Sequence, residues 1–590
     1  MTINLSSCTQ PSSGLWARSA TTRWLPLLLW AGIVAALFYQ LGIAALFEPD
    51  EGRNAEKARE ILVLNDWVTP HENFHPVLDK PMFFYWAIAA AYKLFGVSEW
   101  AARLPSVLAA LGCIALVYRF AYSYGGRWTA LWSALVLFTC VEFFVLARVV
   151  IFDMLLSFFL TLSLCAFYEA LHAHNARQRR VWFLAMGLGL GCATLSKGLV
   201  GIFVPGMAIL GYLLLSKQWQ APKILDVVAA ALLFAAIVAP WYLIAEWRNP
   251  GYLRYYLWQE HFGRFVTNEF DRAEPWYYFI GVGLIGFMPW SVLLPLVVRH
   301  AYKTGWQLKL SDHSLYLVSW AVLPFLFFSI SKSKLPHYIL PIFPALAMLT
   351  AAALVRFYQE APGNLRVALS LTWWVQVVCS IYLFLGWILP EILPRQIRFA
   401  VGAMPGFIGL YGALTFVIVV YMTRRSRAAP PSLRRLYMVQ SLSLCFFLAL
   451  IIKMMILTSS ERSAKAIAQA TRPKLAATTQ VVQYDTYLAG LSFYLQSERP
   501  IWLITRDGKE RTVLGNYYAI GKQQDPATRW GQAIFNLQEF YEYWNTTKQP
   551  LLVVLKDKNL RRFTKNLNEA PARLAAEDEY VLVTRAAALF

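Results

Sequence analysis

Residues 24–47 read WLPLLLWAGIVAALFYQLGIAALF, an apolar run that no charged side chain interrupts. About twenty apolar residues are enough for a helix to cross a bilayer. The run is too long for the core of a signal peptide and no small-residue cleavage site follows it, so we expect a retained first span. Similar runs recur along the 590 residues, of which 58% are hydrophobic and only 15% are charged. This composition indicates an integral membrane protein.

The apolar runs predict about thirteen membrane-spanning helices, and the charges in the loops predict their orientation. The candidate spans are 24–47, 101–122, 128–146, 150–171, 181–197, 199–216, 224–246, 276–298, 314–330, 337–355, 367–389, 401–423 and 436–457. Basic residues collect in alternate loops, at positions such as Arg177, Arg179, Arg180, Lys217, Lys223, Arg299, Arg356, Arg366, Arg424 and Arg425. These loops belong inside by the positive-inside rule, and the odd number of spans places the C-terminus outside.

The charge and the cysteines exclude two other classes of protein. The net charge of +20 lies mostly in short loops between apolar runs, which is typical of a topology signal and of attraction to anionic lipid. No aromatic and basic surface for nucleic acid stands out. The seven cysteines have no paired spacing, so we expect neither a disulfide framework nor a cysteine metal site.

The chain is predicted to divide into a transmembrane domain, residues 1–457, and an outer soluble domain, residues 458–590. Short apolar strands are expected in the soluble part at 480–484, 501–505, 551–555 and 580–583, with an amphipathic helix at 536–544. This pattern predicts a small α/β domain. It contains no nucleotide-binding glycine motif and no cluster of metal ligands.

The first outer loop, residues 48–100, carries charges for which the positive-inside rule gives no reason. It begins EPDEGRNAEKAREIL, whose apolar positions predict a helix on the membrane surface with Asp50 and Glu51 near its positive end. A capped surface helix with solvated ion pairs is the alternative to a catalytic role. Further on, VLDKPMFFYW places Asp79 and Lys80 before an apolar helix too short to span. Lys80 could bind a lipid phosphate there, or simply snorkel beside its aspartate.

Asp153 stands just inside the fourth predicted span. A carboxylate at that depth costs free energy, so a functional role is the default hypothesis. Other charged and polar side chains gather in outer loops, namely Lys197 in LSKG, His261 and Arg264 in EHFGRF, and Lys334 and Tyr338 in SKSKLPHYILP. The cations of this set, together with Lys80, could bind a phosphate. A single histidine such as His261 is more often a structural residue than a metal ligand.

Taken in order, these motifs resemble the aminoarabinose lipid A transferases, bacterial relatives of the protein O-mannosyltransferases with the GT-C membrane fold. The matching elements are DEGRNAEKAREIL, DKPMFFYW, the aspartate of ARVVIFDM, LSKG, EHFGRF and SKSKLPHYILP. Each element is weak alone, but the set runs from the first span to the tenth and is specific to the superfamily. The resemblance implies a polytopic α-helical GT-C protein with interfacial helices and an outward α/β domain.

The same resemblance implies a glycosyltransferase of the bacterial inner membrane that works on the periplasmic side. Its donor would be a sugar such as 4-amino-4-deoxy-L-arabinose on undecaprenyl phosphate, and its acceptor lipid A. The implied acidic residues are Asp50 and Asp153, and the implied phosphate ligands are Lys80, Arg264 and Tyr338, with Glu51 and Arg53 in the same first loop.

The family resemblance also implies one metal ion. In similar enzymes the acid before the Lys-Pro pair and the histidine of the EHF motif can share a zinc ion, which would be Asp79 and His261 here. No other cofactor and no nucleotide sugar are implied. This chain has Asp79 where glutamate is usual, and Asn54 where tyrosine often follows the arginine.

Two questions stay open at the level of sequence. The acceptor could be lipid A, another glycan or lipid, or an exported protein. If it is a hydroxyl, Asp50 could act as the general base, whereas an anionic phosphate needs only positioning. The rival class is a transporter, which the few ionisable residues in mid-span and the lack of an inverted repeat do not favour.

Overall fold

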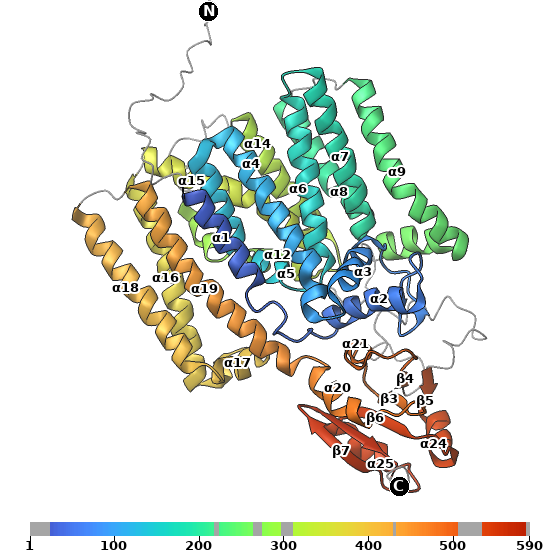
Figure 1. Cartoon of the computed structure of the whole chain (residues 1–590). Coiled ribbons are helices and arrows are strands. Elements are labelled where there is room, and N and C mark those ends of the chain that lie inside the picture. Colours follow the sequence, from blue (N-terminus) through green and yellow to red (C-terminus); the bar gives the residue numbers. More distant parts are fainter. Residues whose placement is uncertain are drawn as a thin grey trace, which may run out of the picture.

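The apolar runs form a bundle of long helices, and a small α/β unit packs against one end of it (Figure 1). The structure, a computed structural model, describes residues 24–217, 223–263, 274–296, 311–360, 362–428, 432–505 and 534–585. The main helices of the bundle are α1 (Leu25–Phe38), α4 (Glu99–Thr139), α5 (Val141–Ala147), α6 (Phe152–Leu171), α7 (Ala176–Lys197), α8 (Val200–Ser216), α9 (Ile224–Arg248), α12 (Tyr278–Gly286), α14 (Asp312–Ile330), α15 (Phe343–Glu360), α16 (Pro362–Ile388), α18 (Pro405–Ala428) and α19 (Leu433–Glu461). Shorter elements between them are α10 (Tyr252–Arg254), the π-helix η2 (Tyr255–Gly263), the 3-10 helices η3 (Trp290–Leu293), η4 (Pro336–Ile342), η5 (Pro390–Ile392) and η6 (Arg395–Ile397), and α17 (Arg398–Gly402).

Each predicted span overlaps a helix, but the number of thirteen spans is not confirmed. Among the described residues, eight helices are long and apolar enough to cross a membrane, or nine if the bent pair of α12 and η3 counts as one. Helices α1 and α8 are apolar but shorter. The break predicted between 122 and 128 lies at Gly126, whose φ of +73° kinks the 41-residue helix α4. Glycine adopts this conformation without the steric penalty that a side chain would bring.

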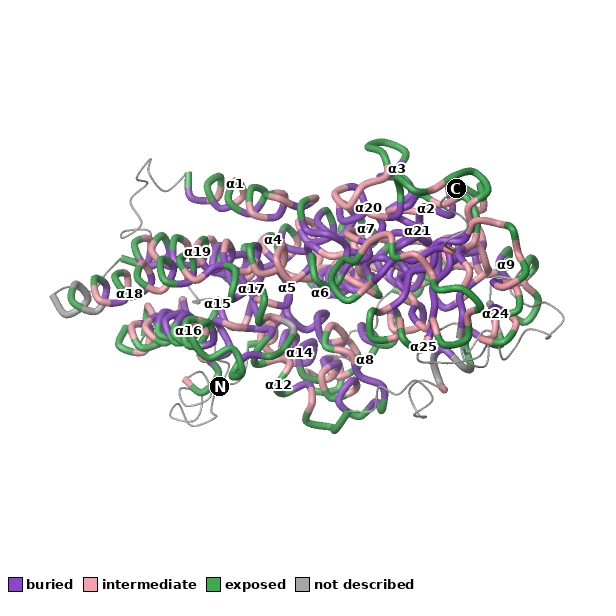
Figure 2. Tube along the Cα trace, turned by 90° about the horizontal axis from the view of Figure 1, so that it is seen from below, coloured by how far each residue is buried: buried purple, intermediate pink, exposed green. Residues whose placement is uncertain are grey.

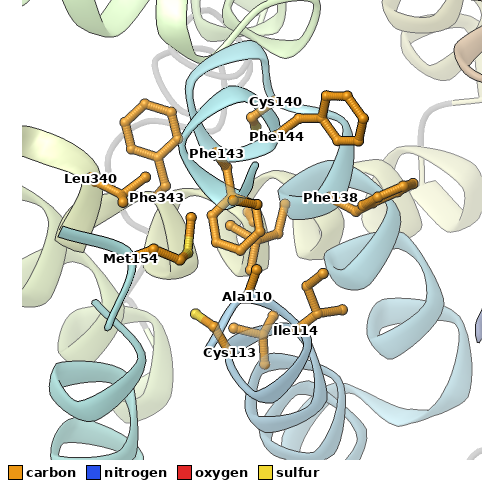
Figure 3. Packing of buried hydrophobic residues seen from close by; sticks show 14 of the residues in the cluster. Ala110, Cys113, Ile114, Phe138, Cys140, Phe143, Phe144, Met154, Leu340 and Phe343 are labelled. Carbon is orange, nitrogen blue, oxygen red and sulfur yellow. The ribbon is translucent and has the colours of Figure 1, made fainter. Parts of the chain in front are cut away.

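The core of the bundle lies where α4, α5, α6 and α15 meet. Figure 3 shows Ile114 of α4, Met154 of α6 and Phe343 of α15 arranged around Phe143 of α5. All four side chains are fully buried. Close packing of large apolar side chains fixes the positions of the helices relative to one another. The first turn of α6, which carries Asp153, is therefore held firmly against the bundle.

The outer helices carry large apolar side chains on their surface. On α9, Trp247, Ile224 and Leu232 are 80%, 71% and 66% exposed. Figure 2 shows exposed residues along α1, α9 and α18, and buried residues concentrated between them. Soluble proteins rarely expose apolar surface on this scale. The chain is thus a multi-pass membrane protein, as its composition predicted.

The first outer loop folds into two helices joined by a hairpin. These elements are α2 (Asp50–Leu64), β1 (His71–Glu72), β2 (His75–Pro76) and α3 (Phe83–Phe95). Both predicted helices are present. However, Glu51, Gly52 and 54–61 are buried, so a surface helix with solvated ion pairs is the wrong description of α2. The helix is covered because α3 and, from the C-terminal unit, α21 (Gly490–Leu495) pack against it.

The C-terminal unit is built on a six-stranded sheet in the order β5-β4-β3-β6-β8-β7. Its elements are α20 (Lys465–Thr471), η7 (Arg472–Lys474), β3 (Gln480–Tyr484), α21 (Gly490–Leu495), β4 (Trp502–Thr505), β5 (Ile534–Asn536), α24 (Leu537–Thr546), β6 (Leu551–Lys556), η10 (Asp557–Asn559), α25 (Leu560–Thr564), β7 (Ala572–Glu577) and β8 (Tyr580–Thr584). Strands β3 to β6 are parallel, and β7 and β8 are antiparallel additions. The four predicted strands and the predicted helix are present. Helix α19 crosses the predicted boundary at 457/458, and the division into two domains stays a prediction.

Direct hydrogen bonds join this unit to the first outer loop. The Glu48 carboxylate accepts a hydrogen bond of 2.7 Å from the amide of Gly490. A Cβ atom on Gly52 would lie 2.7 Å from that same amide nitrogen, so glycine is what allows the close approach. Asn73 exchanges two hydrogen bonds of 2.8 Å with the backbone of Ile501. The first outer loop and the C-terminal unit therefore form one continuous structure.

Candidate active site

A cavity of about 350 Å³ opens between α6, α8 and α14, and we call it the apolar cavity. Its lining residues are Lys80, Asp153, Leu156, Lys197, Leu199, Val200, Phe203, Glu260, Phe327, Phe328, Ser331, Ser333 and Tyr338. Leucine, valine and phenylalanine side chains make most of the wall. The charged side chains come from the first turn of α6, the last turn of α7, η2 and the segment before α3. Such a cavity suits a ligand with an apolar body and one charged group.

Asp153 is the buried acid of this cavity, with only 1% of its surface exposed. It forms an ion pair with Lys197, and the Nε2 atom of His337 lies 3.6 Å from its other oxygen. The Lys197 ammonium sits 4.4 Å from the centre of the Tyr338 ring, a cation–π contact. The structure thus brings together three residues that the sequence predicted separately, and it adds His337. Because a carboxylate this deep is stable only with a partner, Asp153 depends on Lys197.

Lys80 reaches the same cavity from the loop before α3. Its ammonium donates a hydrogen bond of 2.8 Å to the carbonyl of Asp79 and lies 3.4 Å from Glu260. Glu260 is buried on η2 and also accepts a hydrogen bond of 3.2 Å from the hydroxyl of Tyr255. The cavity therefore holds two lysine–carboxylate pairs. A bound phosphate would be drawn to both ammonium groups.

A second cavity of about 300 Å³ lies at the start of α2, and we call it the polar cavity. Its lining residues are Phe47, Glu48, Pro49, Asp50, Glu51, Val145, Val149, Val150, Ile151 and Arg462. The Asp50 side chain is 61% exposed, and Arg53 lies 3.6 Å from it. Asp50 and Asp153 therefore face different cavities. The short segment 148–151 stands between them.

Glu51 holds the short segment 148–151 in place. Its carboxylate receives two hydrogen bonds from Arg103 of α4, at 2.9 and 2.8 Å. It also accepts one of 2.8 Å from the amide of Val150. A two-pronged arginine pair with an added backbone bond fixes geometry strongly. Glu51 thus acts as a structural residue between α2, α4 and the wall of the polar cavity.

Glu72 of the β1–β2 hairpin links the first outer loop to the C-terminal unit. Its carboxylate lies 3.2 Å from Arg53 and 3.2 Å from Lys57. The hydroxyl of Tyr487, which follows β3, donates a hydrogen bond of 2.8 Å to it. Burial lowers the pKa of Lys57, but the charges of Asp79, Tyr85 and Glu72 and the hydrogen bond to Asp79 together raise this pKa above its usual value. Glu72 therefore sets the position of Arg53, the partner of Asp50.

The predicted zinc site lies partly outside the described residues. Asp79 is buried and bonded to the Lys57 ammonium, which competes with a metal cation for its carboxylate. The backbone of His261 belongs to η2, but its side chain lies outside the part that the structure describes, as does Arg264. Within the described ranges no group of three or more metal-binding side chains occurs. The zinc site and the role of Arg264 stay predictions.

Lys334 is placed differently from the other predicted phosphate ligands. Its ammonium donates to the backbone carbonyls of Glu274, at 2.7 Å, and Ser331. It does not appear among the residues that line the apolar cavity. Ser331 and Ser333 line the cavity instead. Lys334 thus shapes the loop before η4.

The chain is similar to known proteins in both sequence and structure. A model of the dolichyl-phosphate-mannose-protein mannosyltransferase family matches residues 55–256. The undecaprenyl phosphate-alpha-4-amino-4-deoxy-L-arabinose arabinosyl transferase of Aeromonas salmonicida is 34% identical over 58% of this chain. The namesake from Enterobacter is 28% identical over 68% of this chain and 72% of its own length. The chain spans about three fifths of the Aeromonas relative, 61% of its length.

The structural match is more extensive than the sequence matches. The crystal structure of ArnT from Cupriavidus metallidurans bound to undecaprenyl phosphate superposes with a TM-score of 0.82 and 25% identity, covering 97% of this chain and 99% of that one. The apo structure of the same Cupriavidus protein superposes with a TM-score of 0.80. The resemblance to aminoarabinose transferases and the polytopic GT-C fold, both expected from the motifs, are thereby confirmed.

Proposed function

We propose that this chain is an integral membrane glycosyltransferase that moves 4-amino-4-deoxy-L-arabinose from undecaprenyl phosphate to lipid A. The observation that carries the proposal is the apolar cavity with its paired lysines, in a chain that matches ArnT bound to undecaprenyl phosphate along nearly its whole length. The part of a polyprenyl tail next to the phosphate fits the leucine and phenylalanine walls. Its phosphate fits the end at which Lys80 and Lys197 lie.

The chemistry of the leaving group follows from this arrangement. Negative charge builds up on the donor phosphate as its bond to the sugar breaks. Prearranged cations stabilise that charge most when they do not have to move. Asp153 holds Lys197 at the cavity wall, and Glu260 does the same for Lys80. We add Arg264 to the cations that bind the donor phosphate, because the EHFGRF motif of the family implies this role.

The acceptor approaches from the side of the polar cavity. Asp50 lines this cavity, and we assign the donor phosphate to the separate apolar cavity. The anomeric carbon is then attacked from the face opposite the leaving phosphate, which produces inversion of configuration. Arg53, held by Glu72, keeps Asp50 oriented toward the acceptor. Asp50 accepts a proton from the acceptor or orients it.

The enzyme is proposed to lie in the bacterial inner membrane with its active site on the periplasmic side. The basic residues in alternate loops support this orientation, because the positive-inside rule places those loops on the inner side. The first outer loop and the C-terminal unit then face the periplasm together. This is the side on which the lipid-linked sugar and lipid A would meet.

The test is mass spectrometry of lipid extracts from host cells that carry the wild type or the Asp50→Asn variant. A mass shift of one aminoarabinose on lipid A with the wild type alone supports the proposal. Accumulation of the sugar-loaded carrier in the variant places Asp50 in the transfer step. Unchanged lipid A in cells that make the donor would contradict the proposed acceptor.

A protein acceptor is the second candidate, because the matching family model describes protein mannosyltransferases. The same cells distinguish the two functions. Sugar on exported proteins but not on lipid A would favour the second candidate. If neither the wild type nor the Asp50→Asn variant changes the carrier pool or the acceptors, a transporter is favoured instead.

A further inference from the structure

Lys57 of α2 is a fully buried lysine that is not among the lining residues of either cavity. Its ammonium lies 2.8 Å from the carboxylate of Asp79 and 3.2 Å from that of Glu72. It also lies 5.7 Å from the centre of the Tyr85 ring, a cation–π contact. A buried ammonium is costly unless it is paired and hydrogen-bonded. The charge of Lys57 therefore acts on these two acids and not on solvent.

Asp79 carries the effect of Lys57 to the apolar cavity. Its carboxylate accepts a hydrogen bond from the Lys57 ammonium, and its backbone carbonyl accepts one of 2.8 Å from the ammonium of Lys80. Lys80 lines the apolar cavity at the end to which we assign the donor phosphate. A cation stabilises developing charge most when it is already in place. Without Lys57, the Asp79 side chain would lose its anchor, and with it the peptide group that orients Lys80.

The same contact does not fit the zinc ion that the family resemblance implies on Asp79. Zinc would bind a carboxylate oxygen at about 2.0–2.2 Å. The Lys57 ammonium already donates to Oδ1 of Asp79, so the two cations would be close neighbours, and like charges repel strongly where water is excluded. The connected charged side chains also balance without a metal, three cations against three acids: Arg53, Lys57, Lys80, Glu72, Asp79 and Glu260. A divalent ion would leave two positive charges uncompensated within this group.

We propose that Lys57 is a positioning residue of the donor site and that its ammonium takes the place of a metal ion on Asp79. This inference rests on the proposed function, to which it adds how Lys80 is oriented. Lys57 neutralises and fixes the Asp79 carboxylate, and Asp79 in turn fixes Lys80 beside the donor phosphate. Lys57 itself contacts no substrate, since it lines neither cavity.

The zinc content of the purified full-length protein tests whether Lys57 replaces a metal. Zinc is measured by inductively coupled plasma mass spectrometry in the wild type and in Asp79→Asn, both prepared from cells grown with added zinc. We expect the two proteins to contain the same amount of zinc, because neither binds it at position 79. One zinc ion per wild-type chain that is lost in Asp79→Asn overturns the inference.

Binding of undecaprenyl phosphate tests the positioning role and does not depend on turnover. In nanodiscs, Lys57→Met should weaken this binding by about tenfold or more, the order expected for one hydrogen bond to a charged group. Lys465→Met is the matched control, because it removes a lysine paired with Glu99 at 2.7 Å outside both cavities. Unchanged affinity in a folded Lys57→Met protein overturns the inference.

Thermal unfolding is measured on the same samples, because Lys57→Met takes a partner from two buried acids. The double variant Lys57→Met with Asp79→Asn removes the uncompensated charge, and Glu72 keeps Arg53 and Tyr487. A stable double variant that still binds the donor weakly supports the inference, whereas normal donor affinity in it shows a purely structural lysine and overturns it. Failure of the proposed function has a different signature, since the wild type itself would then not bind undecaprenyl phosphate, whatever its zinc content.

Discussion

The two cavities lie on either side of one short backbone segment, yet their walls differ in kind. The apolar cavity has long hydrocarbon walls, and its charged side chains are arranged in lysine–carboxylate pairs. The polar cavity has three acids and an arginine in its wall, beside apolar side chains, and it contains no lysine–carboxylate pair among its lining residues. The difference teaches how two lipids can be kept apart. In the proposed reaction the apolar cavity takes the donor phosphate and the polar cavity faces the acceptor.

Asp50→Asn is the change with the largest expected effect on this comparison. Loss of an acid that handles the acceptor proton should lower kcat by about 10²–10⁴-fold. Donor affinity should not change, because Asp50 lies outside the apolar cavity. Initial rates and donor binding in detergent measure the two quantities. Asp557→Asn, at an exposed aspartate of η10, is the control. A parallel loss of donor affinity would mean that the two cavities are not separate.

Lys197→Gln tests the apolar side. The substitution leaves Asp153 buried without its main partner, which for buried ion pairs costs about 3–5 kcal/mol of stability. It also removes a cation from the donor phosphate. We expect a lower unfolding temperature and donor binding weakened by about tenfold or more.

The double variant Asp153→Asn with Lys197→Gln separates these two effects. With both charges removed, the unfolding temperature should recover while donor binding stays weak. Thermal unfolding and donor titration are measured side by side. If donor binding recovers together with stability, the ion pair serves folding alone.

Tyr487→Phe tests the link from the C-terminal unit to the polar cavity. It deletes the hydrogen bond to Glu72, a bond to a charged group worth about 1.5–3 kcal/mol at most. Only part of this reaches Arg53, so we expect kcat to fall by up to about tenfold. Tyr543→Phe removes a hydroxyl bonded to Gln549 in the same unit and is the control. Equal rates in the two variants would show that Glu72 needs no help from Tyr487.

Glu48→Gln should have the smallest effect on activity, and its distinctive effect is on the pH dependence of stability. Burial raises the pKa of Glu48 to about 8 from 4.5, so the folded chain keeps a proton that the unfolded chain releases. Stability from this group is complete below pH 4.5 and is lost as pH rises to 8 and beyond. Glutamine does not titrate. Between pH 5 and 9 the unfolding temperature of the variant should therefore decline less than that of the wild type, and parallel curves would refute this.

The sequence predicted the helices well because each span is a long apolar run, and Asp153 stood out because a carboxylate in such a run is costly. The pairing of Asp153 with Lys197, and of Glu51 with Arg103, was not predictable from spacing. These partners lie 44 and 52 residues apart, and only the packing of α4, α6 and α7 brings them together. The bond from Tyr487 to Glu72 spans 415 residues.

Some elements of the C-terminal unit escaped prediction for a different reason. Strand β7, Ala572–Glu577, lies at the edge of the sheet and is only partly buried. Alanine and glutamate are weak strand formers, and an edge strand needs no apolar alternation. Strand β5 has only three residues. Strands β3 and β6 are central and almost completely buried, and both were predicted at their correct positions.

The burial of α2 also bears on the order in which contacts form while the chain is synthesised. Asn73 contacts a residue 428 positions later in the chain, and at about 5–20 residues per second the ribosome needs roughly 20–90 s to make that stretch. During this interval α2 lacks the cover that α21 provides. Its ion pairs with the hairpin, Arg53 and Lys57 to Glu72, join residues synthesised almost together. The charges of the first outer loop can thus be paired early, while the newly inserted helices wait for the C-terminal unit to close over them.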